Sequence, residues 1–259
     1  MLAPQSQIAG SEGVYYFEEN ATDSRTTLFH LSPLQRRVAT VLSLGLAFLM
    51  IVSAAPARAG SATPQVYGQT IGNWGHAWWQ WALNFPTANN PILQDGNVDC
   101  SAGQSGHVWY LVGTFGGSAE RTCSIKQGKA IFFPLFNGIH WTPLNPAVPE
   151  DCTDEPDCRA GVGALIDTIE SWTCMVDETP CVWSYQVVRT QSDARRFNIP
   201  VGSIADTDFG YDPGRRMISI ADGYWVMLDP LPRGPHTIHF TSNAPGFSLD
   251  VTYHLTVGP

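Results

Sequence analysis

Residues 247–257, FSLDVTYHLTV, alternate apolar and polar side chains without interruption. An extended strand places the two sets on opposite faces: Leu249, Val251, Tyr253, Leu255 and Val257 on one face, and Asp250, Thr252, His254 and Thr256 on the other. A period of two is typical of a half-buried β-strand. The end of the chain therefore predicts a sheet that packs one face on a core and presents the other to water.

The same period recurs upstream, between clusters of Pro, Gly and Asp. It appears in residues 182–188, 216–220, 223–228 and 236–240. Two apolar runs, residues 107–115 and 129–136, indicate buried strands, and Pro134 confines the second to a sheet edge or a bulge. About seven strands of this kind predict a mainly β fold. We expect an antiparallel β-sandwich, immunoglobulin-like or jelly-roll-like, with two short helices.

Four tryptophans in eight positions mark the first expected helix, GNWGHAWWQWALNF (72–85). Thr70 can cap its start, and Pro86 ends it. Apolar residues at 71, 74, 78, 81 and 85 follow helical spacing. This stripe predicts that Trp74, Trp78 and Trp81 belong to the core.

Trp79 lies about 120° from the centre of that stripe, beside Leu83 and near His76. Either the helix is covered on both sides, or Trp79 lines a cleft. A second helix is expected at residues 162–172, after an acidic loop at 143–158.

The beginning of the chain differs from the rest. Residues 36–59 combine Arg36 and Arg37, an apolar run and an Ala-Arg-Ala exit, which is the pattern of a signal peptide. A membrane anchor is the alternative, and Pro56 argues against it. Residues 1–35 are too long and too acidic for a signal n-region and are expected to be an extension from an early start codon. Residues 60–259 then form one secreted or periplasmic domain, without membrane insertion after cleavage.

Charge and cysteine usage restrict the possible partners. The formal net charge of −9 disfavours binding to nucleic acid, whose phosphates repel an acidic protein. Six cysteines behind a signal peptide indicate disulfides, with zinc as the competing use. Of the possible connectivities, short spacing favours the sequential pairs Cys100/Cys123, Cys152/Cys158 and Cys174/Cys181.

Three motifs along the chain suggest a relationship. They are W-x3-WW-x-W (74–81), G-x-V-W-Y-L-V-G (106–113) before R-T-C-S-I-x-x-G-K-A-I-F-F-P (121–134), and D-G-Y-W-V-M-L-x-P-L-x-x-G-x-H-T-I-x-F (222–240). Together they resemble a group of uncharacterised secreted bacterial β-sandwich proteins to which no activity is assigned. The phrase P-L-x-x-G-x-H-T-I-x-F is also similar to a late strand of many immunoglobulin-like or jelly-roll domains, which implies fold only.

Candidate site residues are sparse, because the sequence contains no complete motif for a catalytic nucleophile or a zinc site. Trp79, His76, Tyr224 and Trp225 are the expected ligand contacts. Weak catalytic candidates are Asp222, which precedes Gly223-Tyr224-Trp225, and the pair His239 and Asp250. The latter two should be neighbours if the last two strands form a hairpin across 242–246. Asp222-Gly223 is also a good turn dipeptide.

Calcium is the one cofactor with any support in the sequence. Asp206, Asp208 and Asp212 alternate as calcium-loop ligands do, but the remaining positions of such a loop do not match. No other cofactor is expected.

Three functions are compatible with these patterns. The first is a secreted protein that binds carbohydrate or another extracellular ligand through aromatic residues. The second is a hydrolase or lyase of an extracellular polymer that uses carboxylates or histidines. The third is a structural envelope protein.

Overall fold

The structure is a computed structural model that describes residues 64–143, 152–182 and 186–259. The expected extension (1–35) and signal peptide (36–59) lie outside the described residues. Within these ranges no helix is long and apolar enough to cross a membrane.

Two β-sheets face each other and enclose the main core, as the sequence predicts. The six-stranded sheet has the order β1-β3-β11-β10-β5-β6, and the five-stranded sheet has the order β2-β4-β9-β7 with β8 paired to β9. The strands of the first sheet are β1 (Gly96–Asn97), β3 (Gly117–Lys126), β5 (Ser171–Val176), β6 (Thr179–Pro180), β10 (Gly234–Ala244) and β11 (Phe247–Gly258). Those of the second are β2 (Val108–Tyr110), β4 (Ala130–Trp141), β7 (Val187–Gln191), β8 (Arg195–Ile199) and β9 (Gly214–Leu228).

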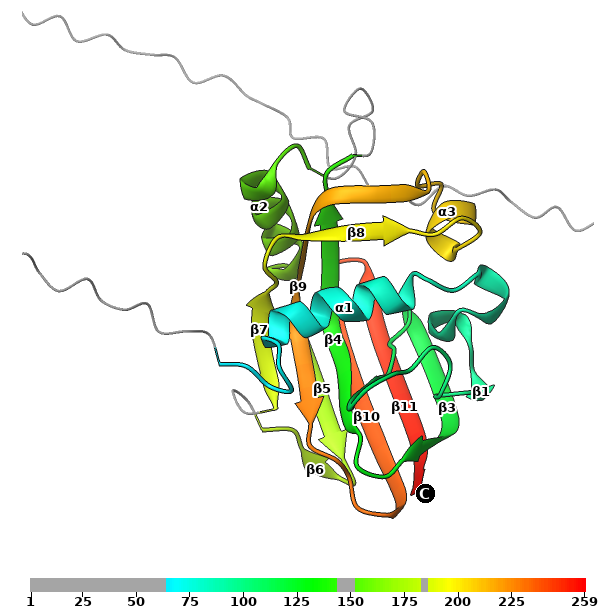
Figure 1. Cartoon of the computed structure of the whole chain (residues 1–259). Coiled ribbons are helices and arrows are strands. Elements are labelled where there is room, and N and C mark those ends of the chain that lie inside the picture. Colours follow the sequence, from blue (N-terminus) through cyan, green and yellow to red (C-terminus); the bar gives the residue numbers. More distant parts are fainter. Residues whose placement is uncertain (1–63, 144–151, 183–185) are drawn as a thin grey trace, which may run out of the picture. The chain divides into compact units, whose positions relative to one another are not determined.

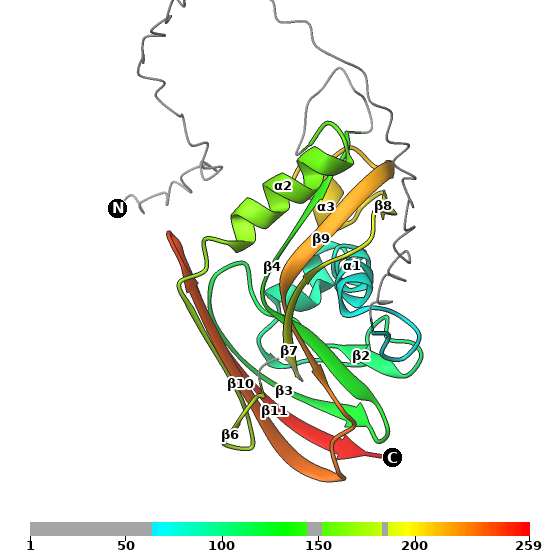
Figure 2. The same ribbon diagram turned by 90° about the vertical axis from the view of Figure 1, so that its left-hand side faces the viewer.

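Helices add a further layer to the sandwich. They are α1 (Ile71–Ala82), α2 (Glu155–Ile166) and α3 (Ile204–Thr207), with 3-10 turns η1 (Thr87–Asn89) and η2 (Pro91–Leu93). Helix α1 crosses β4, β9 and β7 on the side of that sheet away from β10 and β11 (Figures 1 and 2). Helix α2 packs on the upper part of β4 and β9 (Figure 2). The outer face of the six-stranded sheet keeps the polar residues of β11, with Asp250 and His254 exposed.

The pairing within the sheets is mostly antiparallel, with three parallel exceptions. β10 and β11 form the expected hairpin, in which Ile238 lies opposite Tyr253. β3 runs parallel to β11, β1 parallel to β3, and β2 parallel to β4. Pro134 lies at a register irregularity of β4, which confirms the expected bulge.

All three disulfides join the predicted sequential pairs. Cys100 bonds Cys123, Cys152 bonds Cys158, and Cys174 bonds Cys181. The described residues contain no free cysteine. Disulfides of this number are typical of proteins that fold in an oxidising compartment.

Two element boundaries differ from the predictions. The second helix begins at Glu155 and ends at Ile166, several residues earlier than expected, because Asp154 caps it by accepting from the Asp157 N–H at 3.0 Å. Residues 214–228 form one strand with no turn at Asp222. Gly223 allows close packing there, since a Cβ at this position would lie 2.7 Å from the Asn137 Cβ.

The face that α1 packs on the sheet also differs from the expected stripe. The helix begins where predicted, with Thr70 Oγ1 accepting from the Asn73 N–H at 3.2 Å. A Cβ at Gly72 would lie 2.0 Å from the Gln191 carbonyl oxygen, and one at Gly75 would lie 2.4 Å from the Trp225 ring. The two glycines therefore bring the helix close to the sheet.

This contact changes the expected burial of the tryptophans. Trp78 is 2% exposed, whereas Trp74 and Trp81 are only partly buried, like Trp79. The predicted core stripe is thus confirmed for Trp78, and Trp74 and Trp81 pack against the same core cluster while remaining partly exposed.

Candidate functional site

A pocket of about 270 Å³ lies beside β4, between α1 and the tip of the β10–β11 hairpin. Trp78 and Trp79 contribute to it from α1, residues 134–137 from β4, and Leu165 and Thr168 from the end of α2. The loop 113–115 and the hairpin tip complete the wall. The lining is mainly aromatic and aliphatic with a few polar groups, which is the character of a small-molecule site.

The pocket lies where the edge of β4 is no longer paired with β2. β2 pairs with β4 only as far as Phe132, and the chain then leaves the sheet. Pro134, at the irregularity of β4, has no backbone N–H to offer another strand. Side chains from α1, α2 and the hairpin tip surround this stretch of β4 in place of a strand.

Two side chains that line the pocket carry buried N–H groups without a partner. Among the described residues, neither Trp79 Nε1 nor Asn137 Nδ2 has a hydrogen bond, and both atoms are shielded from solvent. A buried polar group that lacks a partner costs about 1–3 kcal/mol. Both donors belong to residues that line the pocket, but the two nitrogens themselves are shielded from its open space, so a ligand reaches them only after a small movement of these side chains.

The other three indoles of α1 behave differently from Trp79. Trp74 Nε1 donates to the Val66 carbonyl at 2.7 Å, Trp78 Nε1 to that of Leu111 at 2.7 Å, and Trp81 Nε1 to that of Ala102 at 3.2 Å. These indoles fasten the helix to neighbouring loops. The lack of a partner at Trp79 is therefore a local feature of the pocket.

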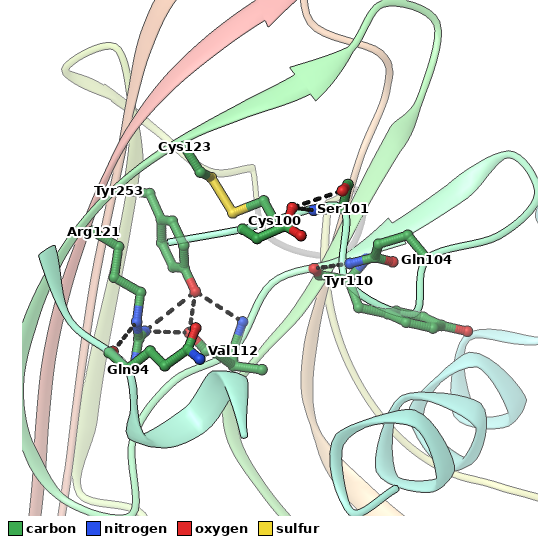
Figure 3. The surroundings of a disulfide bond; sticks show 10 residues. Gln94, Cys100, Ser101, Gln104, Tyr110, Val112, Arg121, Cys123 and Tyr253 are labelled. Carbon is green, nitrogen blue, oxygen red and sulfur yellow. Dashed lines mark hydrogen bonds between the residues drawn. A yellow bond between two sulfur atoms is a disulfide. The ribbon is translucent and has the colours of Figure 1, made fainter. Parts of the chain in front are cut away.

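A buried arginine forms hydrogen bonds with the backbone of two residues that line the pocket. Arg121 is 1% exposed and lies on β3, next to the ring of Tyr253 (Figure 3). Its Nη2 donates to the carbonyls of Ile92 and Gly113, each at 3.1 Å, and both residues line the pocket. Its Nε donates to the Gln94 carbonyl at 2.8 Å and its Nη1 to that of Val112 at 3.0 Å. Arg121 thus links the inner face of the six-stranded sheet to the backbone of the pocket wall.

The expected ligand contacts separate into one that lines the pocket and three that do not. Trp79 lies in the wall. Trp225 is 0% exposed, stacks on Phe132 and donates to the Thr190 carbonyl, so it offers no surface to a ligand. Tyr224 packs between the sheets near Trp172.

His76 is buried on the other side of α1, against Phe197. The Ser219 hydroxyl donates to the Arg195 carbonyl at 2.8 Å. Because a hydroxyl has one proton, Ser219 Oγ accepts from His76 Nε2, which lies 2.7 Å away. His76 therefore cannot withdraw the Ser219 proton in this arrangement, and the pair is a structural contact.

The burial of His76 predicts a loss of stability in acid. Burial lowers the pKa of His76 from 6.5 to about 4, and the charge of Arg195 acts in the same direction. The unfolded chain then binds the proton more strongly, so stability falls as the pH decreases from about 6.5 towards 4. We expect a loss of about 3 kcal/mol from this residue.

Urea unfolding at pH 7.5 and pH 4.5 measures this loss. The His76→Gln variant is the control, because it lacks the titrating group and should lose less stability between the two values. Equal losses in the variant and the wild type would show that His76 does not titrate as expected.

The catalytic candidates lie in two different sheets. His239 Nε2 lies 2.9 Å from Asp250 Oδ1 across the β10–β11 hairpin, which confirms that they are neighbours. Asp222 belongs to β9 and is 1% exposed. It accepts from Arg189 Nη2 at 3.0 Å, Gln191 Nε2 at 3.1 Å and the Gly223 N–H at 2.7 Å. Its carboxylate is therefore occupied by structural hydrogen bonds, and it does not converge with the histidine pair.

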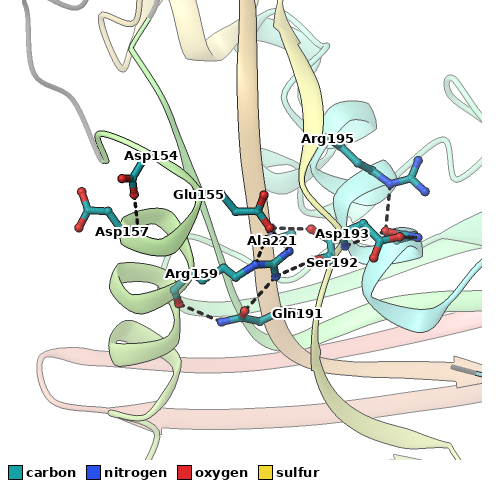
Figure 4. Close-up of polar contacts among 10 residues, drawn as sticks. Asp154, Glu155, Asp157, Arg159, Gln191, Ser192, Asp193, Arg195 and Ala221 are labelled. Atoms are coloured by element: carbon teal, nitrogen blue, oxygen red, sulfur yellow. Dashed lines mark hydrogen bonds and ion pairs between the residues drawn. The ribbon is translucent and has the colours of Figure 1, made fainter. Parts of the chain in front are cut away.

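A group of polar side chains beside Asp222 (Glu155, Arg159 and Gln191, called the polar seam) connects α2 with β7 and the residues that follow β7. Arg159 pairs with Glu155 at 2.8 Å and donates to the Ser192 carbonyl at 3.0 Å (Figure 4). Gln191 Nε2 donates to the Arg159 carbonyl at 2.9 Å. This seam positions α2, whose end contributes Leu165 to the pocket.

The calcium candidates do not form a loop. Asp206 lies in α3, Asp208 is at the C-cap of that helix, and Asp212 lies in the segment before β9. Asp206 accepts from the Gly202 N–H at 2.7 Å. Hydrogen bonds from Thr207 and Thr87 lower the pKa of the Asp208 carboxyl. The described part of the chain contains no group of three or more His, Cys, Asp or Glu side chains that could hold a metal ion.

Sequence reasoning identified Trp79 but missed the other parts of the pocket. Asn137 lies in β4, directly after the predicted apolar run 129–136, and Phe115, Thr168 and Phe247 come from distant segments. The polar Asn137 within an apolar run was the one local signal that could have indicated it.

Comparisons with known proteins add little to this geometry. No family model and no curated protein matches the chain. A cysteine protease inhibitor from Entamoeba histolytica is 16% identical, covering 58% of this chain and 96% of its own, with a TM-score of 0.21. Amebosin is 13% identical, covering 60% of this chain and 100% of its own, with a TM-score of 0.18. Likenesses at these scores carry no argument about function.

Proposed function

We propose that this protein is an exported binding protein that holds a small, uncharged and largely apolar ligand in the pocket beside β4. The observation that carries the proposal is the pair of buried, unpartnered donors, Trp79 Nε1 and Asn137 Nδ2. A ligand oxygen that accepts from them removes a cost that the empty protein bears. Export is supported by the signal-peptide pattern at residues 36–59 and by the three disulfides.

The walls of the pocket favour an apolar body for this ligand. Phe115, Phe136 and Phe247 offer aromatic surface, and Ile92 and Leu249 offer aliphatic surface. No Lys, Arg or His among the described residues lines the pocket, so an ionised acid would be buried there without a counter-charge. The oxygen is therefore that of a ketone, ester, ether or amide.

Carbohydrate, the ligand class first expected from the tryptophans, fits this pocket less well. Sugar hydroxyls both donate and accept, so a sugar site needs acceptors as well as donors. The two buried unpartnered atoms of the pocket residues are both donors, and apart from Thr114, Thr168 and Asn137 the lining side chains are apolar. The second expected function, catalysis, has no converging set of groups in the pocket, because Asp222 and the His239–Asp250 pair lie elsewhere.

The test compares two probes of similar shape, butyrophenone and butylbenzene, by titration calorimetry. We expect butyrophenone to bind about tenfold more tightly, because its carbonyl accepts from one or both donors. Trp79→Phe and Asn137→Leu should each remove most of that preference. Asn137→Leu should also raise the melting temperature of the empty protein by a few degrees, since it removes an unsatisfied donor at similar volume.

Two results would contradict the proposal. Equal affinity for the two probes would mean that the donors do not recognise the ligand. Binding to a glycan array with no binding of either probe would instead favour the carbohydrate function. Thr256→Val is a matched control, because its hydroxyl is exposed on β11 and outside the pocket lining.

A further inference from the structure

Exposed apolar side chains gather at the mouth of the pocket. Phe115 is 45% exposed and Leu165 is 42% exposed, although both line the pocket. Phe209, which is 43% exposed, packs edge-on against Phe115 with ring centroids 5.3 Å apart. Phe115 follows β2 and Phe209 follows α3, so the two rings come from distant segments.

This arrangement separates the site into a polar and an apolar end. The donor atoms of Trp79 and Asn137 are shielded from solvent. The rings of Phe115 and Phe209 instead remain in contact with water. Exposed apolar groups that adjoin a pocket mark an interaction surface more often than isolated ones do.

We propose that the ligand is a single-chain amphiphile, which enters with an uncharged carbonyl head and leaves its hydrocarbon chain across Phe115 and Phe209. This inference rests on the proposed function and extends it. The head accepts from the two donors, and the chain covers the rings at the mouth. Because the part of the lining that the structure describes holds no cation, an ester, ketone or amide head is preferred over a free carboxylate.

The volume of the pocket limits how much of such a molecule it can enclose. The cavity of about 270 Å³ equals the volume of about nine liquid waters, at about 30 Å³ each. A ligand that occupies more than this volume must extend through the mouth, where Phe115, Phe209 and Leu165 are the exposed apolar groups. The affinity for a homologous series therefore reports whether the mouth takes part.

The experiment titrates the intact exported protein with unbranched methyl ketones, from 2-hexanone to 2-tetradecanone. In the wild type, each methylene should strengthen binding about fourfold, which corresponds to about 0.8 kcal/mol, and the increase should continue beyond 2-nonanone. In the variant Phe209→Ser, 2-hexanone should bind as in the wild type, because Phe209 lies outside the pocket lining. Longer ketones should gain less affinity per methylene than in the wild type, because the chain loses apolar surface at the mouth.

The outcomes separate the two proposals. If short ketones bind but the affinity stops rising at the same chain length in the wild type and the variant, the mouth plays no part and this inference fails alone. If no ketone binds, the proposed function fails as well. Val201→Ser is the control for a general loss of exposed apolar surface, because Val201 is 85% exposed and lies outside the pocket lining. Should Phe209→Ser not fold, Phe209→Ala gives the same comparison.

Discussion

Replacing Arg121 with alanine is expected to lower the free energy of unfolding by about 4 kcal/mol. The guanidinium is 1% exposed and donates to four backbone carbonyls and to the Tyr253 hydroxyl. The substitution leaves carbonyls of η2 and of the 111–113 segment buried without this donor. It also opens a cavity beside Tyr253.

Urea unfolding followed by circular dichroism measures this effect. Arg121→Lys keeps the charge but offers three donors instead of five, so it should recover only part of the loss. Arg233→Ala is the matched control, because Arg233 is exposed and should change stability by less than about 0.5 kcal/mol. An Arg121→Ala variant within about 1 kcal/mol of the wild type would contradict the role assigned to this residue.

The second large effect is expected for Trp78→Ala, with a loss of about 4 kcal/mol. Trp78 is 2% exposed, contacts the rings of Trp79, Trp81 and Trp225, and donates to the Leu111 carbonyl. Truncation removes most of the packing between α1 and the sheet and the hydrogen bond to Leu111. Trp79→Ala should cost less than about 2 kcal/mol, because its side chain is only partly buried and its Nε1 has no protein partner to lose.

Thermal melts of the four tryptophan variants distinguish these environments. Trp74→Ala and Trp81→Ala should fall between the two extremes, since both rings are partly buried and each donates one hydrogen bond. If Trp79→Ala melts as early as Trp78→Ala, Trp79 is a core residue, and the pocket loses its principal wall.

Several features of the fold followed from local patterns. The alternation in β10 and β11 identified the hairpin, and with it the neighbouring positions of His239 and Asp250. Thr70 identified the start of α1 through the cap it provides. The short spacing of the cysteines identified the disulfide pairs. In each case the interacting residues are close in sequence or repeat at a fixed period, so the pattern itself carries the information.

β3 was missed because its buried positions are Ala119, Arg121, Cys123 and Ile125. An arginine in the second of these positions breaks the apolar alternation by which a strand is recognised. Its burial is tolerated because carbonyls of distant loops accept its hydrogen bonds. Asp222 was interpreted as a turn residue because Asp-Gly favours turns. In the structure its carboxylate is buried and paired with Arg189.

Periodicity and cysteine spacing were sufficient to predict a disulfide-bonded β-sandwich with a tryptophan-rich helix, because the period shows which face of each element is buried. They do not show which element covers that face. The parallel pairing of β3 with β11 and the packing of α1 through Gly72 and Gly75 depend on contacts between distant segments and are seen only in the folded chain. The pocket could not be predicted from the sequence either, because it is a space between α1, β4 and the β10–β11 tip. Its two donors lack a partner only once these distant segments pack together.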